Sequence, residues 1–214
     1  MSIFVTGTDT NVGKTITCGL LLKKYYKIYP KIRYWKPIQT GYPPDDDTEV
    51  VHNISFLPKE YSLENIKFKL SVSPHLASEF ENKVIDIDQL KKDFKKYSKT
   101  YSLIIEGAGG ILVPLTRNYF WIDWIADLQL PVLVVARSTL GTINHTLLTI
   151  EVLKYRKLKT IGIIFCGKQE EEYIKDNRKI IQDISQLPVI SYFDFTKEKD
   201  IDPDPNFILQ PYLS

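Results

Sequence analysis

Short apolar runs alternate with stretches of helical spacing along most of this chain. The apolar runs are expected to be strands, and they cover residues 3–5, 32–35, 103–105, 131–136, 161–165 and 188–190. Helical spacing follows the first run and recurs over residues 86–99, 119–128, 142–155 and 170–184. Strands that are apolar throughout and alternate with helices are typical of a parallel sheet covered on both faces. The pattern therefore predicts an α/β fold with a doubly wound, mainly parallel sheet.

The sequence also indicates how many domains the chain forms. Residues 54–80 contain Pro58 and Pro74 and are expected to form an irregular excursion of the same unit. No internal repeat, low-complexity tract or linker interrupts the sequence, so we expect a single domain over residues 1–214. The helix expected over residues 142–155 places five apolar side chains on its inward face: Ile143, Leu147, Leu148, Val152 and Leu153.

The most informative polar pattern follows the first strand. The chain there reads Phe4-Val5-Thr6-Gly7-Thr8-Asp9-Thr10-Asn11-Val12-Gly13-Lys14-Thr15, which predicts a strand, a glycine-rich turn and the start of a helix. In such a loop the backbone N–H groups bind phosphate, the lysine reaches the β- and γ-phosphates, and the threonine hydroxyl binds Mg²⁺. Five residues separate the two glycines instead of the usual four. The sequence thus predicts a variant phosphate-binding loop and a P-loop NTPase-like fold.

Charged side chains follow two further strands, at the sheet edge where ligands of such folds bind. Glu106 ends the strand 103–105 and is expected to face a metal ion, or else to cap the backbone of residues 107–110. Asp47 is a second candidate ligand of Mg²⁺, or a residue of a solvated turn. Lys36 follows the strand 32–35 and is expected either to hold an anionic reactant or to be an exposed lysine.

A glycine-led helix start follows the most apolar strand. Gly141-Thr142-Ile143-Asn144-His145 presents free N–H groups that would suit a carboxylate, or that simply begin an ordinary helix. The three histidines of the chain have no metal-ligand spacing with one another, and His145 is expected to be structural.

Composition narrows the classes of function. The chain has 28 basic and 26 acidic residues, so no strong overall charge favours nucleic acid or a membrane as partner. Cys18 and Cys166 are too few for a disulfide framework, and Cys18 is expected to be a small buried residue of the first helix. No signal peptide precedes the first strand and no apolar run has the length of a membrane span, so we expect a cytoplasmic protein.

Several motifs together resemble the dethiobiotin synthetase family. They occur in order over most of the chain up to about residue 165. The long-spaced loop is quite specific, and its conjunction with the motifs at 106–110 and 140–145 is more specific still. The others are Trp35-Lys36-Pro37 with Thr40-Gly41, Ser73-Pro74-His75, Glu106-Gly107-Ala108-Gly109-Gly110, Asp123-Trp124 and Leu140-Gly141-Thr142-Ile143-Asn144-His145.

The resemblance implies an ATP- and Mg²⁺-dependent ligase that works as a homodimer on 7,8-diaminononanoate and CO₂. In that family one amine captures CO₂ as a carbamate, and the carbamate oxygen attacks the γ-phosphate to give a carbamic–phosphoric anhydride. The second amine then closes the ureido ring of dethiobiotin, with release of ADP and phosphate. This chemistry needs no protein nucleophile, and no nucleophilic triad is found in the sequence.

The resemblance also implies a role for each matching residue. Lys14 and Lys36 would contact phosphate and carbamate, and Mg²⁺ would be held by Thr15, Asp47 and Glu106. The diamine would be contacted by Thr40 and, across the dimer interface, by Gly141, Thr142, Ile143, Asn144 and Tyr173. The nucleotide would lie against Thr10, Asn11, Val12, Gly13, Lys14, Thr15, Ile16, Asp47, Glu106, Gly107, Ala108 and Gly109.

Two positions depart from the family pattern. The family usually has an asparagine that recognises adenine where this chain has Cys166, and a thiol lacks the paired donor and acceptor of an amide. We therefore expect weak discrimination of the base, with other nucleoside triphosphates able to replace ATP. Asn11 stands where the family usually has an acidic residue.

Other P-loop proteins are the alternatives. A dimerising switch ATPase of the chromosome-partitioning type carries a second lysine five residues before the loop lysine, and Asp9 occupies that position here. A GTPase or a small-molecule kinase is a further alternative, but the guanine-reading pattern N-K-x-D of a GTPase is absent from the sequence. A non-catalytic nucleotide-binding module is disfavoured by Lys36 and Glu106 at strand ends.

Overall fold

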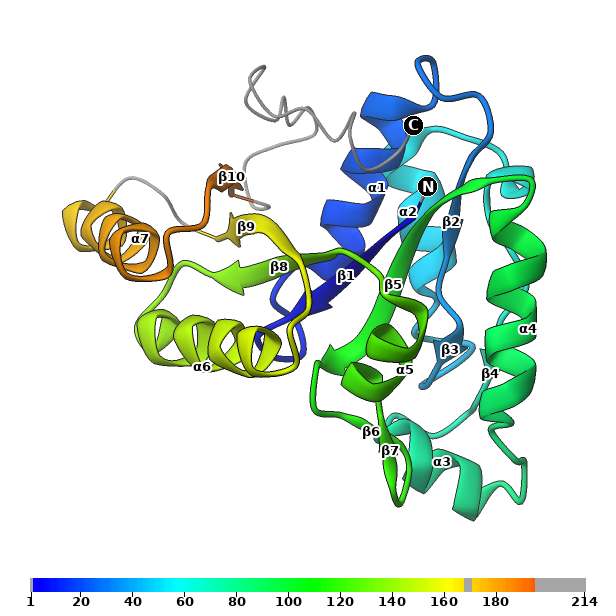
Figure 1. Cartoon of the computed structure of the whole chain (residues 1–214). Helices are drawn as coiled ribbons and strands as arrows, with labels where there is room; N and C mark the ends of the chain where they lie inside the picture. Colours follow the sequence, from blue (N-terminus) through cyan, green and yellow to red (C-terminus); the bar gives the residue numbers. More distant parts are fainter. Residues whose placement is uncertain (1, 168–170, 195–214) are drawn as a thin grey trace.

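The structure is a computed structural model, and it describes residues 2–167 and 171–194. Its centre is a parallel sheet of six strands in the order β10-β9-β8-β1-β5-β2 (Figure 1). These strands are β1 (Ser2–Gly7), β2 (Ile32–Trp35), β5 (Ser102–Gly110), β8 (Val132–Arg137), β9 (Thr160–Cys166) and β10 (Val189–Phe193). Because all six run in parallel, their carboxyl ends lie at one edge of the sheet. The glycine-rich loop after β1 and the residue Lys36 after β2 lie at that edge.

Helices cover both faces of the sheet. On one face α1 (Lys14–Tyr25) packs on the sheet and α2 (Asp47–Ser55) packs on α1. The other face is covered by α4 (Ile87–Ser98), α5 (Trp121–Leu128), α6 (Thr142–Tyr155) and α7 (Glu172–Ser185). Smaller elements complete the described residues: β3 (Ile38–Gln39), η1 (Lys59–Tyr61), β4 (Ile66–Lys67), α3 (Pro74–Phe80), β6 (Pro114–Thr116) and β7 (Tyr119–Phe120). The doubly wound, parallel α/β fold predicted from the sequence is confirmed.

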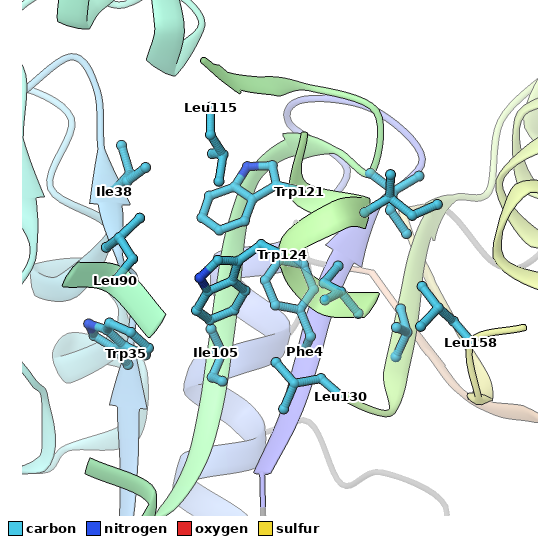
Figure 2. Close-up of a cluster of buried hydrophobic side chains, with 14 of the residues drawn as sticks. Phe4, Trp35, Ile38, Leu90, Ile105, Leu115, Trp121, Trp124, Leu130 and Leu158 are labelled. Atoms are coloured by element: carbon cyan, nitrogen blue, oxygen red, sulfur yellow. The ribbon is translucent and has the colours of Figure 1, made fainter. Parts of the chain in front are cut away.

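The core on the α4–α5 face is built around aromatic side chains. Trp124 of α5 is fully buried and its ring lies against those of Phe4, Trp35 and Trp121 (Figure 2). The ring of Phe94 on α4 also lies against it. Its indole N–H has no hydrogen-bond partner among the described residues, so the ring contributes through burial and packing alone.

Replacing Trp124 by alanine is expected to lower the free energy of unfolding by about 3–5 kcal/mol, because a large buried ring leaves a cavity. Replacing it by phenylalanine retains one aromatic ring and removes the unpaired N–H, so a clearly smaller loss is expected. Urea denaturation followed by circular dichroism measures both variants. Equal losses in the two variants would contradict the packing explanation.

Most predicted elements agree with the structure, and the differences lie at their ends. The helix 142–155 and the strand 32–35 have the predicted bounds. Glu106 was expected at the end of a strand, but β5 continues to Gly110 and carries Glu106 within it. The helix expected from residue 119 begins at Trp121, because Tyr119 and Phe120 pair with β6 as a short hairpin.

Two predictions about packing need correction. Residues 54–80 are not wholly irregular: they contain the end of α2, η1, β4 and α3, the last begun by Pro74 at its first position. Leu148 was expected to face inward but is 57% exposed. Threonines at positions 142, 146 and 149 are buried on α6, so its buried face is rotated away from Leu148.

Within the described ranges, no helix has both the length and the apolar character to cross a membrane.

Candidate functional site

The glycine-rich loop lies between β1 and α1 and has the backbone shape of an anion-binding turn. Asn11 and Gly13 both have positive φ, at 56° and 98°, and α1 begins directly after them at Lys14. Asparagine is one of the few residues with a side chain that tolerate this region, which accounts for its place in the longer loop. The turn and the helix start together direct backbone N–H groups at one point, as phosphate binding requires.

The side chain of the loop lysine, Lys14, contacts the backbone of its own loop. Lys14 is buried and its Nζ donates to the carbonyl oxygen of Asp9 at 2.9 Å. Burial lowers the pKa of Lys14, and the nearby charge of Glu106 offsets only part of this shift. Lys14 therefore lacks a full counter-charge in the loop. A bound phosphate would supply that charge.

A second group of charged side chains lies beside the start of α1. Lys36 forms ion pairs with Asp47 and with Glu106, the latter at 3.1 Å between Nζ and Oε1. The Thr15 hydroxyl lies 2.8 Å from Glu106 Oε1 and 3.1 Å from Asp47 Oδ1. Four elements distant in sequence thus bring Thr15, Lys36, Asp47 and Glu106 together.

Strand register accounts for this convergence. Trp35 pairs with Ile105 in the parallel ladder between β2 and β5, so the next residues, Lys36 and Glu106, are neighbours. Asp47 is brought in by α2, which begins there because Asp46 caps the helix by accepting from the N–H groups of Thr48 and Glu49. Asp47 is therefore a helix residue facing the site, and not part of a solvated turn.

The lysine of this group remains charged despite being buried. Burial alone would lower the pKa of Lys36, but the charges of Glu106 and Asp47 outweigh it and raise the pKa to about 12. Lys36 is 5% exposed, so the alternative of an ordinary exposed lysine is wrong. The structure provides a fixed cation between two carboxylates at the sheet edge.

The oxygen atoms of this group suit a magnesium ion. Mg²⁺ prefers hydroxyl, carboxylate and water oxygens in octahedral geometry at about 2.1 Å, which places adjacent ligand oxygens about 3 Å apart. The distances of 2.8 Å from the Thr15 hydroxyl to Glu106 Oε1 and 3.1 Å to Asp47 Oδ1 both match this spacing of adjacent ligand oxygens. No cluster of three or more His, Cys, Asp or Glu ligands was found in the described part of the chain. A site of this composition would therefore be completed by water and phosphate oxygens.

Glu106 has a further partner that was not predicted from the sequence. The Tyr34 hydroxyl donates to Glu106 Oε2 at 2.7 Å, and both side chains are fully buried. Burial, followed by the charge of Glu106, raises the pKa of Tyr34 well above its usual value, so the phenol stays protonated. The available signal was spacing: Tyr34 stands two residues before Lys36 and so faces the same side of β2.

A cavity of about 570 Å³ joins the loop to this charged group. Thr40, Asp47 and the end of β5 at Ala108 and Gly109 all line it. Val12, Glu106 and Gly107 are buried and do not line it, although Glu106 contacts Thr15 and Lys36, which do. The predicted site residues that line it are Thr10, Asn11, Gly13, Lys14, Thr15, Ile16, Lys36, Thr40, Asp47, Ala108 and Gly109.

The residues expected to contact the far end of the substrate lie elsewhere. Gly141, Ile143 and Asn144 line a separate cavity of about 460 Å³ between α6 and α7. Thr142 is buried and its hydroxyl contacts that of Thr146, while Tyr173 is exposed on α7 and does not line this cavity. A single chain therefore does not bring these five residues to the phosphate loop.

Cys166 ends β9 with its thiol turned toward α1. Its Sγ lies 3.7 Å from the Thr17 hydroxyl, and the side chain is 1% exposed. Burial raises the pKa of this thiol to about 12, so it is neutral. Cys18 is fully buried, as predicted. The cysteine thus contributes a packed surface beside the helix start instead of an exposed polar group.

Comparison with known proteins identifies the family. A family model described as an AAA domain matches residues 1–198. The ATP-dependent dethiobiotin synthetase BioD of Sphingopyxis alaskensis is 39% identical over 193 residues, with 87% of each chain covered. The enzyme of the same name from Bacillus cereus strain B4264 is 34% identical over 92% of this chain and 86% of its own. The chain belongs to the dethiobiotin synthetase family. It is accordingly a ligase that forms carbon–nitrogen bonds.

Solved structures of P-loop ATPases share the fold of this dethiobiotin synthetase-family chain. The apo McdA structure from Cyanthece superposes with a TM-score of 0.57 at 14% identity, over 89% of this chain and 84% of that chain. A ParA family ATPase from Chlorobium tepidum gives a TM-score of 0.57 at 12% identity, over 90% and 84%. At such identities the likeness concerns the fold alone, and the switch-ATPase alternative is not favoured.

Proposed function

We propose that this chain makes dethiobiotin from 7,8-diaminononanoate, CO₂ and ATP. The observation that carries the proposal is the pair of buried lysines, Lys14 and Lys36, lining one cavity with Thr15 and Asp47. The names of the relatives, ATP-dependent dethiobiotin synthetases at 34–41% identity, support ATP as the nucleotide and a small molecule as the acceptor.

The proposed reaction has three steps. One amine of the substrate adds to CO₂ and loses a proton, giving a carbamate. A carbamate oxygen then attacks the γ-phosphorus, the bond from that phosphorus to the β-phosphate bridging oxygen breaks, and ADP leaves. Finally the second amine attacks the carbamoyl carbon of the mixed anhydride and loses a proton, so that the ring closes and phosphate leaves.

The side chains act mainly by positioning and by charge. Carbamate and triphosphate are both anionic, and bringing them together requires cations fixed in place before the reaction. Lys14 would bind the phosphates from the loop, and Lys36, held by Glu106 and Asp47, would lie between phosphate and carbamate. When bound at Thr15, Asp47 and Glu106, Mg²⁺ would neutralise part of the phosphate charge.

A homodimer would complete the substrate site. Thr40 lines the loop cavity and would contact the amine end of the diamine. The helix start of α6, with Gly141, Ile143 and Asn144, lines a different cavity, so it would receive the carboxylate of a diamine bound mainly by the partner subunit. Tyr173 on α7 would assist there.

We also propose that residues 1–214 form one ligase domain that acts in the cytoplasm.

The decisive experiment is to supply the purified protein with ATP, Mg²⁺, bicarbonate and the diamine. Dethiobiotin and ADP, identified by mass, are expected in equal amounts, and omission of the diamine should abolish ADP formation. ATP hydrolysis that does not depend on the diamine, without any cyclic urea, would contradict the proposal.

Discrimination between nucleotide bases is expected to be weak. The buried thiol of Cys166 packs toward Thr17 and supplies no paired donor and acceptor to a base. Initial rates with ATP, GTP and CTP under equal conditions should lie within about a hundredfold, the scale that a specific polar contact supplies. A preference for ATP beyond that ratio would contradict this prediction.

A further inference from the structure

Tyr34 occupies an unusual place for a tyrosine in a hydrophobic core. It belongs to the apolar cluster between the sheet and α1, where phenylalanine would fill nearly the same space. Its hydroxyl is nevertheless directed at Glu106, with 2.7 Å between Tyr34 OH and Oε2. The register of β2 and β5 explains the contact, because Tyr34 pairs with Ile104 and Glu106 lies two residues further along the same face.

The two oxygens of Glu106 have different partners. Oε1 faces the Thr15 hydroxyl and the Lys36 ammonium, at 2.8 and 3.1 Å. Oε2 points the other way and accepts from Tyr34. Since Glu106 is fully buried, no solvent competes for Oε2. The Cys18 thiol also lies beside this carboxylate, but a thiol is a weak donor. Loss of the Tyr34 hydroxyl would therefore remove the strong donor to Oε2 and weaken the orientation of the carboxylate.

We propose that Tyr34 is a positioning residue that orients Glu106, so that Oε1 alone is presented to the divalent cation beside Thr15. The proposal rests on the proposed function, in which Glu106 is a ligand of Mg²⁺. Groups that hydrogen-bond to a ligating side chain fix its orientation, and their removal typically weakens metal binding tenfold to a hundredfold. Tyr34 touches neither nucleotide nor diamine in this arrangement and acts through Glu106.

The test is Tyr34→Phe, which removes one hydroxyl and preserves the ring. Binding of Mn²⁺ is measured by electron paramagnetic resonance in the presence of saturating adenylyl imidodiphosphate, an ATP analogue that is not turned over. The dissociation constant for Mn²⁺ should rise at least about tenfold. Affinity for the analogue without divalent cation should change less than about twofold, because the phosphate loop is untouched. A general packing defect would weaken both.

Two further variants make the result specific. Tyr25→Phe removes a hydroxyl from another buried tyrosine of the same cluster, on α1, and should leave the Mn²⁺ constant within about twofold. Glu106→Gln removes the charge of the proposed ligand and should weaken Mn²⁺ more than Tyr34→Phe does. Because Tyr34 acts through Glu106, adding Tyr34→Phe to Glu106→Gln should change the constant by less than about twofold.

The outcomes separate this inference from the function on which it rests. An unchanged Mn²⁺ constant in Tyr34→Phe, together with a large loss in Glu106→Gln, would overturn the role of Tyr34 alone. No loss in Glu106→Gln would overturn both the metal assignment and the role of Tyr34. Equal and additive losses from the two substitutions would show that Tyr34 does not act through Glu106, and would also overturn the inference.

Discussion

Replacing Lys36 by alanine is expected to reduce kcat at least about a thousandfold while nucleotide affinity changes less than about threefold. A single oriented donor at a developing charge contributes about a hundredfold to a thousandfold to catalysis, and Lys36 is a full cation in a buried position. Nucleotide would still bind, because the phosphate loop with Lys14 does not depend on Lys36. Single-turnover formation of dethiobiotin and equilibrium binding of nucleotide measure the two effects separately.

The same substitution will also affect stability, and the experiment must separate the two. Without Lys36, the fully buried Glu106 and the half-buried Asp47 lose their cation, and removing one partner of a buried pair typically costs about 3–5 kcal/mol. Activity is therefore compared at a temperature where circular dichroism shows each variant folded. A small alkylammonium ion added to Lys36→Ala should restore part of kcat if the missing charge is the cause.

Lys67→Ala is the matched control for Lys36→Ala. Lys67 lies near the site, 3.8 Å from Asp46, and its side chain is 39% exposed. Losing this cation changes the local charge equally but removes no contact to Thr15 or Glu106, so kcat should stay within about threefold. A similar loss of kcat in both variants, or near-normal turnover in Lys36→Ala, would remove Lys36 from the mechanism.

Protonation of Lys36 is not expected to limit the pH range of the enzyme. The pKa of Lys36 is raised to about 12 by Glu106 and Asp47, above its usual value of 10.5. The ion pairs therefore stabilise the fold fully below pH 10.5 and lose this contribution only as the pH rises through 12. Over the usual assay range Lys36 is a permanent cation, which fits a binding role and excludes a general base.

The sequence predicted the parallel sheet and the phosphate loop because both depend on local patterns. Continuous apolar strands have no other stable place than the interior of a covered sheet. The proximity of Lys36 and Glu106 was predictable in outline, since both were expected at strand ends along one edge of the sheet. In the structure β5 continues to Gly110, and the register of β2 against β5 is what aligns the two residues. Asp47 was open to two interpretations because its position depends on α2, and the cap by Asp46 that starts this helix is shared with ordinary turns.

Other features of the site depend on contacts that periodicity does not reveal. Tyr34 reads as one more apolar residue of β2, and only the register against β5 brings its hydroxyl to Glu106. Leu148 belongs to an apolar stripe that is wider than the face of α6 that meets the sheet. The order of strands places β8 on the opposite side of β1 from β5 and β2, so Gly141 and Asn144 lie away from the charged group at Lys36 and Glu106.

Replacing Gly7 by alanine is expected to weaken nucleotide binding about a hundredfold. A Cβ at this position would lie 2.6 Å from the carbonyl oxygen of Asp9, 2.7 Å from Val12 Cγ2 and 2.8 Å from Lys14 Nζ. The nearest of these atoms is backbone, so relief requires the loop itself to move. Overpacking typically costs 1–3 kcal/mol, and 1.4 kcal/mol is tenfold in affinity, so strain alone accounts for most of the expected loss.

Gly110→Ala is the matched control, because Gly110 pairs with Gly7 across the β1–β5 ladder. A Cβ there would lie 3.4 Å from the Gly7 carbonyl oxygen, an ordinary contact, so nucleotide affinity should stay within about threefold. Calorimetric titration with ADP measures both variants, and urea denaturation tests whether the sheet is intact. The strain in Gly7→Ala is confined to the loop, so binding should suffer far more than folding does. Affinity within threefold of the unmodified protein in Gly7→Ala would show that the loop accepts a side chain, and would contradict its role as a closely packed phosphate cradle.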